Sequence, residues 1–98
     1  MTLVTPVAHD IPGQRFLAQF PEGKGVLSYE KVGTRTLDLQ HTKVDESLRG
    51  KGVAEALAKA AFAYIREHHL LAIATCPYIQ RWLERHPEQR DIVVTKAE

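Results

Sequence analysis

A glycine-rich segment near the middle of the chain combines the residue types of an anion-binding loop. Residues 49–52 read Arg-Gly-Lys-Gly and precede a stretch rich in alanine and leucine, which favours a helix. Glycine lets the backbone turn tightly and approach a ligand closely, because it carries no Cβ atom. The first N–H groups of a helix lack intrahelical acceptors, and together with the helix dipole they favour phosphate groups. Arg49 and Lys51 add two positive charges, so the segment predicts a site for a phosphate or a diphosphate.

Two side chains outside this segment could take part in group transfer. Cys76 precedes Pro77 and is a candidate N-cap of a second helix, where the helix dipole favours a nucleophilic thiolate. The alternative is a buried cysteine that acts as a small hydrophobic residue. The imidazole of His41 can accept a proton as a general base near neutral pH, and the alternative is a core histidine with a satisfied hydrogen bond. Surface positions are expected for the other histidines, and their spacing with Cys76 predicts no metal site: His9, His68, His69 and His86.

The elements that must position these residues follow from the hydrophobic periodicity. The predicted strands cover residues 14–20, 26–32, 34–44, 70–75 and 91–95, and the predicted helices cover residues 52–68 and 77–85. We expect an irregular lead-in over residues 1–13 and a loop of about five residues between the first two strands, which form an antiparallel hairpin. The uncharged strand at 70–75 is typical of a central strand. Its position after strand and helix favours a right-handed crossover and a parallel strand pair.

The third predicted strand delivers the chain into the glycine-rich segment. Its alternation places His41 on the same face as Leu37 and Leu39. The same alternation places Val44 on the opposite face from Leu39. If Leu39 and Val44 both face inward, a β-bulge is needed between them.

Length and composition limit the class of protein. The 98 residues suit one domain, covering 1–98, and 44% hydrophobic with 26% charged residues is an ordinary globular balance. A net charge of +1 argues against a general nucleic-acid binder. The single cysteine allows no internal disulfide, and the first residues lack the pattern of a signal peptide. We therefore expect a cytoplasmic protein that does not span a membrane.

Residues 49–54, Arg-Gly-Lys-Gly-Val-Ala, fit the pattern Arg/Gln-x-x-Gly-x-Gly/Ala between a strand and a helix. This segment resembles the acetyl-coenzyme A diphosphate signature of the GNAT superfamily of N-acetyltransferases. The chain is most similar to short single-domain members, which share His-Thr-x-Val, here at 41–44, and Cys-Pro-Tyr, here at 76–78. The resemblance covers about residues 14–95. It implies a compact α/β fold with a mixed, mostly antiparallel sheet, one parallel splayed strand pair, one main helix and a short C-terminal helix.

The resemblance also implies a reaction and a set of site residues. Acetyl-coenzyme A would be the co-substrate, no metal would be required, and the acceptor would be an amine of a small molecule or a protein. Backbone N–H groups of residues 51–54 would hold the diphosphate, and Val44 would offer backbone groups to the pantetheine arm. The implied catalytic residues are His41 and Cys76, and whether Cys76 becomes acetylated is a hypothesis. The implied cofactor-binding residues are Val44, Arg49, Gly50, Lys51, Gly52, Val53, Ala54 and Tyr78.

Two other functions stay open at this point. Typical members have one or two helices between their first strands, where the acceptor is bounded, whereas only a few residues connect these strands here. A non-catalytic acyl-coenzyme A sensor or binding module is therefore the first alternative. The second is a nucleic-acid or protein adaptor, against which the low net charge counts. Its basic surface would consist of Arg49, Lys51, Arg81, Arg85 and Arg90. We expect a monomer or a weak homodimer, and the acceptor pocket is either open or completed by a second chain.

Overall fold

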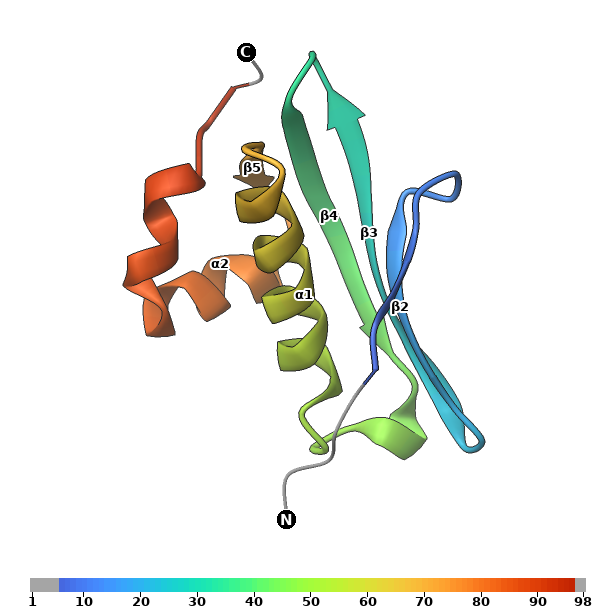
Figure 1. Ribbon diagram of the computed structural model, residues 1–98. Helices are drawn as coiled ribbons and strands as arrows, with labels where there is room; N and C mark the ends of the chain where they lie inside the picture. The colour runs from blue at the N-terminus through green and yellow to red at the C-terminus, as the bar shows by residue number, and fades with distance from the viewer. Residues whose placement is uncertain (1–5, 97–98) are drawn as a thin grey trace.

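The computed structural model describes residues 6–96 and has a five-stranded sheet with helices on one side. The strands, in their spatial order, are β1 (Ala8–Asp10), β2 (Arg15–Phe20), β3 (Gly23–Val32), β4 (Thr36–Val44) and β5 (Leu71–Ala74). The helices are η1 (Glu46–Leu48), α1 (Val53–Glu67), α2 (Pro77–Arg85) and η2 (Pro87–Ile92). Neighbouring strands are antiparallel except β4 and β5, which are parallel. The predicted α/β class, the main helix, the short second helix and the parallel pair are confirmed (Figure 1).

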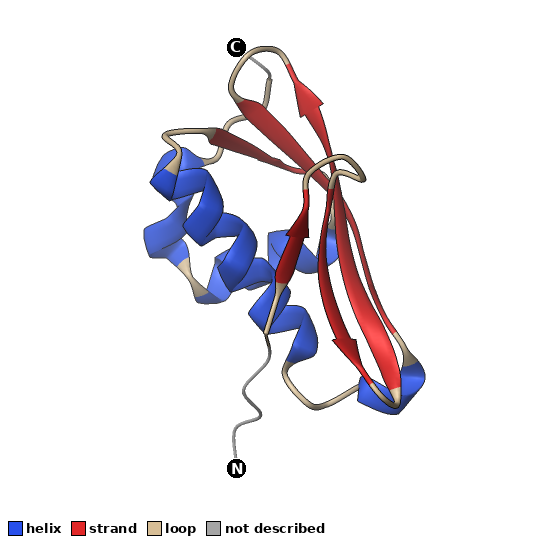
Figure 2. Cartoon of the chain, turned by 45° about the vertical axis from the view of Figure 1, so that its right-hand side comes forward, coloured by secondary structure: helices blue, strands red, loops and turns tan. Residues whose placement is uncertain are grey.

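The two α-helices pack on the same face of the sheet and leave the other face without a helix among the described residues (Figure 2). Alanine and leucine at helical spacing allow α1 to lie close to the strands. The buried side chains of α1 are Val53, Leu57, Ala58, Ala61, Phe62 and Ile65. On the same face, β2 to β4 bury Phe16, Ala18, Leu27, Tyr29, Leu37 and Leu39. Each large apolar side chain buried in this way contributes about 1.5–3 kcal/mol.

The start of α1 approaches β3 closely at Gly25. A Cβ atom built on this buried glycine would lie 2.7 Å from Cγ1 of Val53 and 3.3 Å from Cδ1 of Leu57. A side chain at this position would therefore push the first turn of α1 away from the sheet. The glycine thus fixes where the helix begins relative to the end of β4.

β4 carries a bulge at Gln40. Ser28 of β3 pairs with His41 of β4, but Tyr29 pairs with Leu39, so that Gln40 is the extra residue. The predicted bulge between Leu39 and Val44 is confirmed. Because it comes before His41, the prediction that His41 shares the face of Leu39 is wrong: His41 is exposed on the helix-free face, opposite Ser28.

Four other expectations about the strands are wrong. The predicted irregular lead-in contains β1, whose pairing with β2 aligns His9 with Phe16, while residues 1–5 lie outside the described part. The hairpin loop is a two-residue turn at residues 21–22, because Phe20 pairs with Gly23. β5 lies at the edge of the sheet, and residues 91–95 contribute only an isolated bridge between Ala72 and Val93.

Contacts between distant segments explain these differences. Ser47 Oγ donates to the carbonyl of Glu22 at 2.7 Å, and the Lys24 N–H donates to Asp45 Oδ2 at 2.9 Å. The tight turn is therefore held from the segment around η1. In the C-terminal region, Arg66 makes a bidentate pair with Asp91, with N–O distances of 2.8 and 3.0 Å, and this pair anchors η2 to α1.

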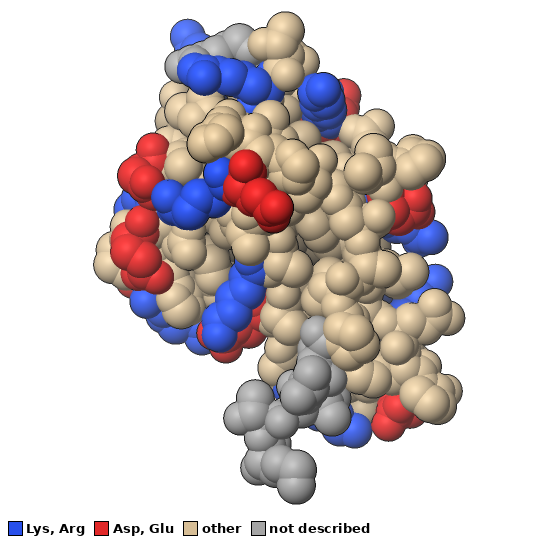
Figure 3. All heavy atoms as spheres, in the orientation of Figure 1, with Lys and Arg blue, Asp and Glu red and all other residues tan. Residues whose placement is uncertain are grey.

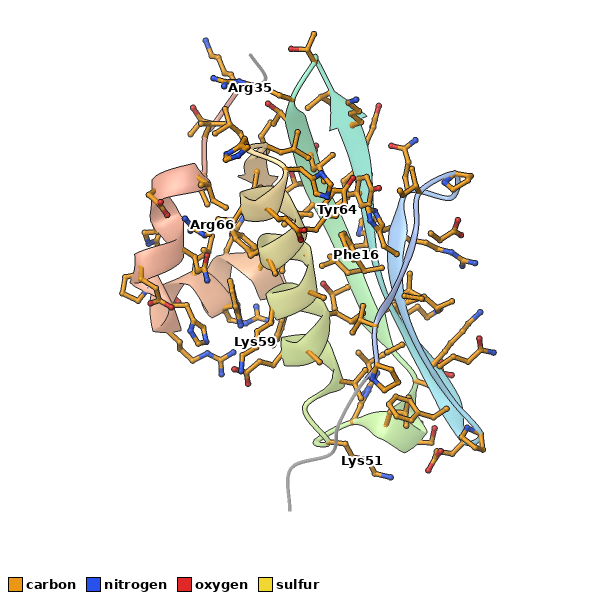
Figure 4. The ribbon with its side chains drawn as sticks, viewed as in Figure 1. Phe16, Arg35, Lys51, Lys59, Tyr64 and Arg66 are labelled. Carbon is orange, nitrogen blue, oxygen red and sulfur yellow. The ribbon has the colours of Figure 1, made fainter. Side chains whose placement is uncertain are left out.

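An aromatic cluster fixes β1 to the sheet. The His9 ring stacks on Phe16 at 4.1 Å between centroids and meets Tyr64 edge-on at 4.3 Å. Phe16 and Tyr64 are labelled in Figure 4. His9 Nε2 also lies 2.6 Å from the Tyr29 hydroxyl. His9 is therefore half-buried, and the prediction of a surface position for it is wrong. Burial, followed by the charge on His68, lowers the pKa of His9, against a smaller opposite effect of Asp10.

Within residues 6–96, no helix is both long enough and apolar enough to cross a bilayer.

The lowered pKa of His9 predicts a loss of stability in mild acid. At pH values between the pKa of His9 in the folded state and its ordinary pKa of about 6.5, the folded state binds fewer protons than the unfolded chain. The contribution of His9 is therefore complete above about pH 6.5 and falls as the pH drops through the folded pKa. Urea unfolding between about pH 8 and 5.5 should show a shallower pH dependence for His9→Gln than for the unmodified protein. The control His41→Gln, at an exposed position, should keep the steeper dependence, and equal slopes for all three proteins would contradict the assignment.

Candidate functional site

β4 and β5 separate at the point where the predicted site begins. Their pairing runs from Thr36 with Leu71 to Leu39 with Ala74. The last bond between the two segments is donated by the Cys76 N–H to the Leu39 carbonyl, at 2.8 Å. Beyond it the chain enters α2, whereas β4 continues to Val44. Residues 40–44 of β4 therefore have one edge without a strand partner, and this is the splayed pair that the resemblance implied.

The glycine-rich loop leaves the start of α1 available to a ligand. Gly50 and Gly52 have φ angles of +78° and +79°, a left-handed conformation that glycine adopts without strain. A Cβ atom at either residue would meet nothing within 4 Å, so the loop faces open space. Gly52 is the N-cap of α1, and no side chain caps the helix. Among the described residues, the N–H groups of Val53 and Ala54 have no acceptor.

Two adjoining cavities follow the loop and the free edge of β4. The loop cavity, of about 270 Å³, lies between the glycine-rich loop and α2. The edge cavity, of about 410 Å³, extends along β4 toward Thr42 and is bordered by Arg81 of α2. Both are lined by Val44, Arg49, Ala54 and Tyr78. We call the two together the cleft.

The cleft brings most of the predicted cofactor-binding residues together. Gly50, Gly52 and Val53 line the loop cavity together with the four shared residues. Lys51 lines neither cavity; its exposed side chain extends from the end of the molecule into solvent (Figure 4). The Lys51 N–H donates to the Leu48 carbonyl at 3.3 Å, so the prediction that this N–H helps to hold a diphosphate is wrong. Lys51 can contribute to the site only through its charge at a distance.

α2 adds a cation to the cleft that the loop pattern did not indicate. Arg85 lines the loop cavity near the phenol of Tyr78. Burial raises the pKa of Tyr78, and the nearby Arg85 guanidinium offsets part of this rise. The phenol is thus protonated at neutral pH and can donate a hydrogen bond into the cleft. The sequence predicts Arg85 only as part of a basic surface, because nothing in the local sequence indicates that α2 folds back over the loop.

One carboxylate also lines the loop cavity. Glu55 stands in the first turn of α1, and its Oε1 lies 3.5 Å from His86 Nε2 and 3.7 Å from Lys59 Nζ. The carboxylate thus lies between Lys59 of its own helix and His86, which follows α2. The His86 ring lies 4.5 Å from the Trp82 ring, tilted by 32°, and the residue is half-buried, so its predicted surface position is wrong.

Cys76 occupies the predicted N-cap position of α2, but its thiol is enclosed. The residue is 2% exposed and makes no capping hydrogen bond with its side chain. Its Sγ lies 3.3 Å from Oγ1 of Thr42, a residue that lines the edge cavity. The thiol is therefore one side chain removed from the cleft, in contact with the core.

His41 lies on the opposite side of the sheet from Cys76 and the loop. A cavity of about 360 Å³, which we call the bare-face cavity, surrounds it on the helix-free face. Its lining consists of Lys24, Val26, Ser28, His41, Lys43 and Asp45. The two predicted catalytic residues therefore flank β4 from different faces.

Charged residues of both signs border the cleft: Lys43, Arg49, Arg81 and Arg85 together with Asp45, Glu46 and Glu55. No three His, Cys, Asp or Glu side chains in the described part of the chain could hold a metal ion together. On the face seen in Figure 3, basic and acidic side chains are mixed over the helices.

Comparisons with known proteins agree with this architecture. A family model described as GCN5-related N-acetyl-transferase matches residues 15–92. Protein NATD1 of Xenopus tropicalis and that of Homo sapiens are each 42% identical to the chain over 83 residues, which cover 83% of this chain and 76% and 74% of those proteins. The solution structure of a GCN5-like protein from Staphylococcus aureus superimposes with a TM-score of 0.71 at 24% identity. The match covers 95% of this chain and 91% of that one.

The positive φ of Gly52 predicts a specific pattern of substitution effects. Gly52→Ala should destabilise the protein by about 1–2 kcal/mol, because alanine is strained in the left-handed region while its Cβ meets no other atom. Gly52→Asn is the matched control and should cost less, since asparagine tolerates this conformation. Urea unfolding measures both. A larger loss for asparagine would mean that space, and not backbone conformation, limits this position.

Proposed function

The chain belongs to the GCN5-related N-acetyltransferase family, and on that premise we propose that it binds acetyl-coenzyme A in the cleft and transfers the acetyl group to an amine. One observation carries the proposal. The unoccupied N–H groups at the start of α1 face a cavity that Arg49 and Arg85 border from two different elements. Such an arrangement fits a diphosphate better than a neutral ligand.

The glycine-rich loop and the free edge of β4 would bind different parts of acetyl-coenzyme A. N–H groups of residues 52–54 would bind the diphosphate, with Arg49 as the adjacent charge and Lys51 as a weaker, more distant one. The free edge of β4 near Val44 would pair with the amides of the pantetheine arm, as an added strand does. Both contacts use backbone groups that the fold leaves without partners, so the residues present fit the ligand.

The side chains around the splayed strands would assist acyl transfer. The ligand supplies an acetyl group as a thioester, which an unprotonated amine can attack. His41 would accept the proton that the ammonium form of the acceptor must lose. Tyr78, protonated at neutral pH, would contact the ligand and could donate a hydrogen bond to it from the cleft.

Cys76 could act in one of two ways. In direct transfer, its thiol supports Thr42 beside the edge cavity; in a two-step route, it would carry the acetyl group as a thioester. Its 2% exposure favours direct transfer, because a carrier must reach both the donor and the acceptor.

The second candidate function is binding of acyl-coenzyme A without transfer. It is favoured by the helix-free face of the sheet, where in the described residues nothing but the strands themselves would bound an acceptor. The two functions require the same cleft and differ only in turnover.

Removal of Arg49 tests the diphosphate site. Arg49→Ala should weaken acetyl-coenzyme A binding about tenfold, equivalent to about 1.4 kcal/mol, because a charge-assisted contact is lost. Lys51→Ala should weaken it by about two- to threefold, since its charge is exposed and screened. Calorimetry measures both, with Arg90→Ala as the control, an exposed guanidinium that lines neither cavity. No binding by the unmodified protein at millimolar ligand would overturn the proposal.

Thiol release with a panel of amines separates transfer from binding alone. Transfer predicts release of coenzyme A that depends on the amine, whereas the second function predicts binding without release. Under direct transfer, mass spectrometry after incubation with acetyl-coenzyme A should find no acetyl adduct on Cys76, and Cys76→Ala should keep measurable turnover. A stable adduct that an added amine discharges would instead establish the two-step route.

A further inference from the structure

Glu55 occupies the helix position from which a carboxylate can block the start of α1. Gly52 is the N-cap of the helix, so Glu55 is the third helical residue. A glutamate at this position often folds back and accepts a hydrogen bond from the N–H of the N-cap residue. We propose that His86 holds the Glu55 carboxylate away from the free N–H groups and is thereby a positioning residue for the ligand site. This role rests on the proposed binding of acetyl-coenzyme A, whose diphosphate would need the same N–H groups.

The Glu55 carboxylate does not cap the helix in the structure. No side chain caps α1, and the Gly52 N–H makes no hydrogen bond within the described residues. Glu55 Oε1 instead lies 3.5 Å from His86 Nε2 and 3.7 Å from Lys59 Nζ. Lys59 is exposed and its side chain is long and flexible. His86 is therefore the partner that can hold the carboxylate in one place.

His86 is fixed by the end of α2. Its N–H donates to the Trp82 carbonyl at 3.0 Å, and its ring lies 4.5 Å from the Trp82 ring. Trp82 is 1% exposed, and its ring lies 5.0 Å from that of Phe62 in α1. Pro87 follows directly and restricts the backbone of His86. The imidazole therefore has a defined position, to which the Glu55 side chain can adapt.

The charge of Glu55 acts inside the cleft. Glu55 lines the loop cavity together with Arg49, Arg85 and Tyr78. Burial raises the pKa of Tyr78, Arg85 offsets part of this rise, and the carboxylate of Glu55 adds to it. A diphosphate in this cavity would meet the same negative charge. A cation beside Glu55 reduces the repulsion, and a carboxylate held at His86 leaves the N–H groups to the ligand.

The protonation of His86 links this contact to pH. The charged groups beside the ring are Glu55 and Lys59 of α1 and Glu88 of η2, whose Oε2 lies 3.4 Å from Nδ1, while Arg85 of α2 lines the same cavity as Glu55. The two ring nitrogens thus face two carboxylates, and only the imidazolium form can donate from both. Histidine side chains generally gain their proton as the pH falls from about 8 to 5. His86 should therefore hold Glu55 best at the acidic end of this range.

Four proteins test the inference: the unmodified chain, His86→Phe, Glu55→Ala and the double variant. Phenylalanine keeps an aromatic ring beside Trp82 and removes both ring nitrogens. His86→Phe should weaken acetyl-coenzyme A binding about two- to fivefold, the range expected for an exposed ion pair. Glu55→Ala should bind at least as tightly as the unmodified chain, and in its background His86→Phe should cause no further loss. Calorimetry measures the four affinities, and urea unfolding verifies that each variant is folded.

His68→Phe is the matched control. His68 directly follows α1, its ring lies 4.2 Å from that of Tyr64, and it lines neither cavity of the cleft, so its replacement should leave the affinity unchanged. An equal loss for His86→Phe with and without Glu55, or no loss in either background, would overturn the inference. His86→Ala takes the place of the phenylalanine variant if that variant does not fold.

The pH dependence gives a readout that a purely structural role of His86 would not change. Dephospho-coenzyme A is the probe, because it keeps the diphosphate but lacks the phosphate monoester, whose second pKa of about 6 lies in the same range. Its affinity should rise more steeply from about pH 8 to 5.5 for the unmodified protein than for His86→Phe. Equal slopes for these two proteins would contradict the assigned role.

NMR of the proteins without ligand separates this inference from the proposed function. In His86→Phe the released carboxylate should approach the Gly52 N–H, so the Gly52 amide signal should differ clearly between His86→Phe and the double variant. The same signal should differ little between the unmodified chain and Glu55→Ala. Failure of this pattern refutes only the role of His86, whereas absent binding of acetyl-coenzyme A by the unmodified protein refutes the proposed function.

Discussion

The arrangement of the site depends on one extra residue in the hydrogen-bond ladder of β4. Without the bulge at Gln40, strict alternation would turn His41 into the core and Thr42 and Val44 away from the helices. With it, Leu39 stays buried, Thr42 reaches the thiol of Cys76, and His41 faces solvent. The bulge therefore decides which side chains of β4 face the helices and which face solvent.

The separation of β4 from β5 and the glycine-rich loop each leave backbone groups without partners. A regular parallel pair would consume the backbone groups of residues 40–44, whereas the turn into α2 after Cys76 leaves them free. The left-handed glycines in turn direct α1 so that its first N–H groups end at the same cleft. Two unsatisfied backbone surfaces meet there, and a ligand with amides and phosphates would complement both.

The sequence predicted the elements better than their long-range contacts. The helix at 52–68 and the parallel crossover were evident because alanine, leucine and periodicity act locally. The need for a bulge also followed from Leu39 and Val44, but its position relative to His41 depends on the register with β3, which no local pattern encodes. The role of Arg85 in lining the cleft and the strand around His9 were missed for the same reason, since both depend on contacts with distant residues.

Contacts at the tip of the β2–β3 hairpin affect how much order a ligand would have to impose on binding. Ser47 and Asp45 hold this tip from the segment that leads into the glycine-rich loop, and Gly25 lets the first turn of α1 rest against β3. Part of the conformational entropy of the segment that leads into the loop is therefore lost during folding and need not be lost again on association. Such preorganisation lowers the entropic cost of binding a ligand at the start of α1.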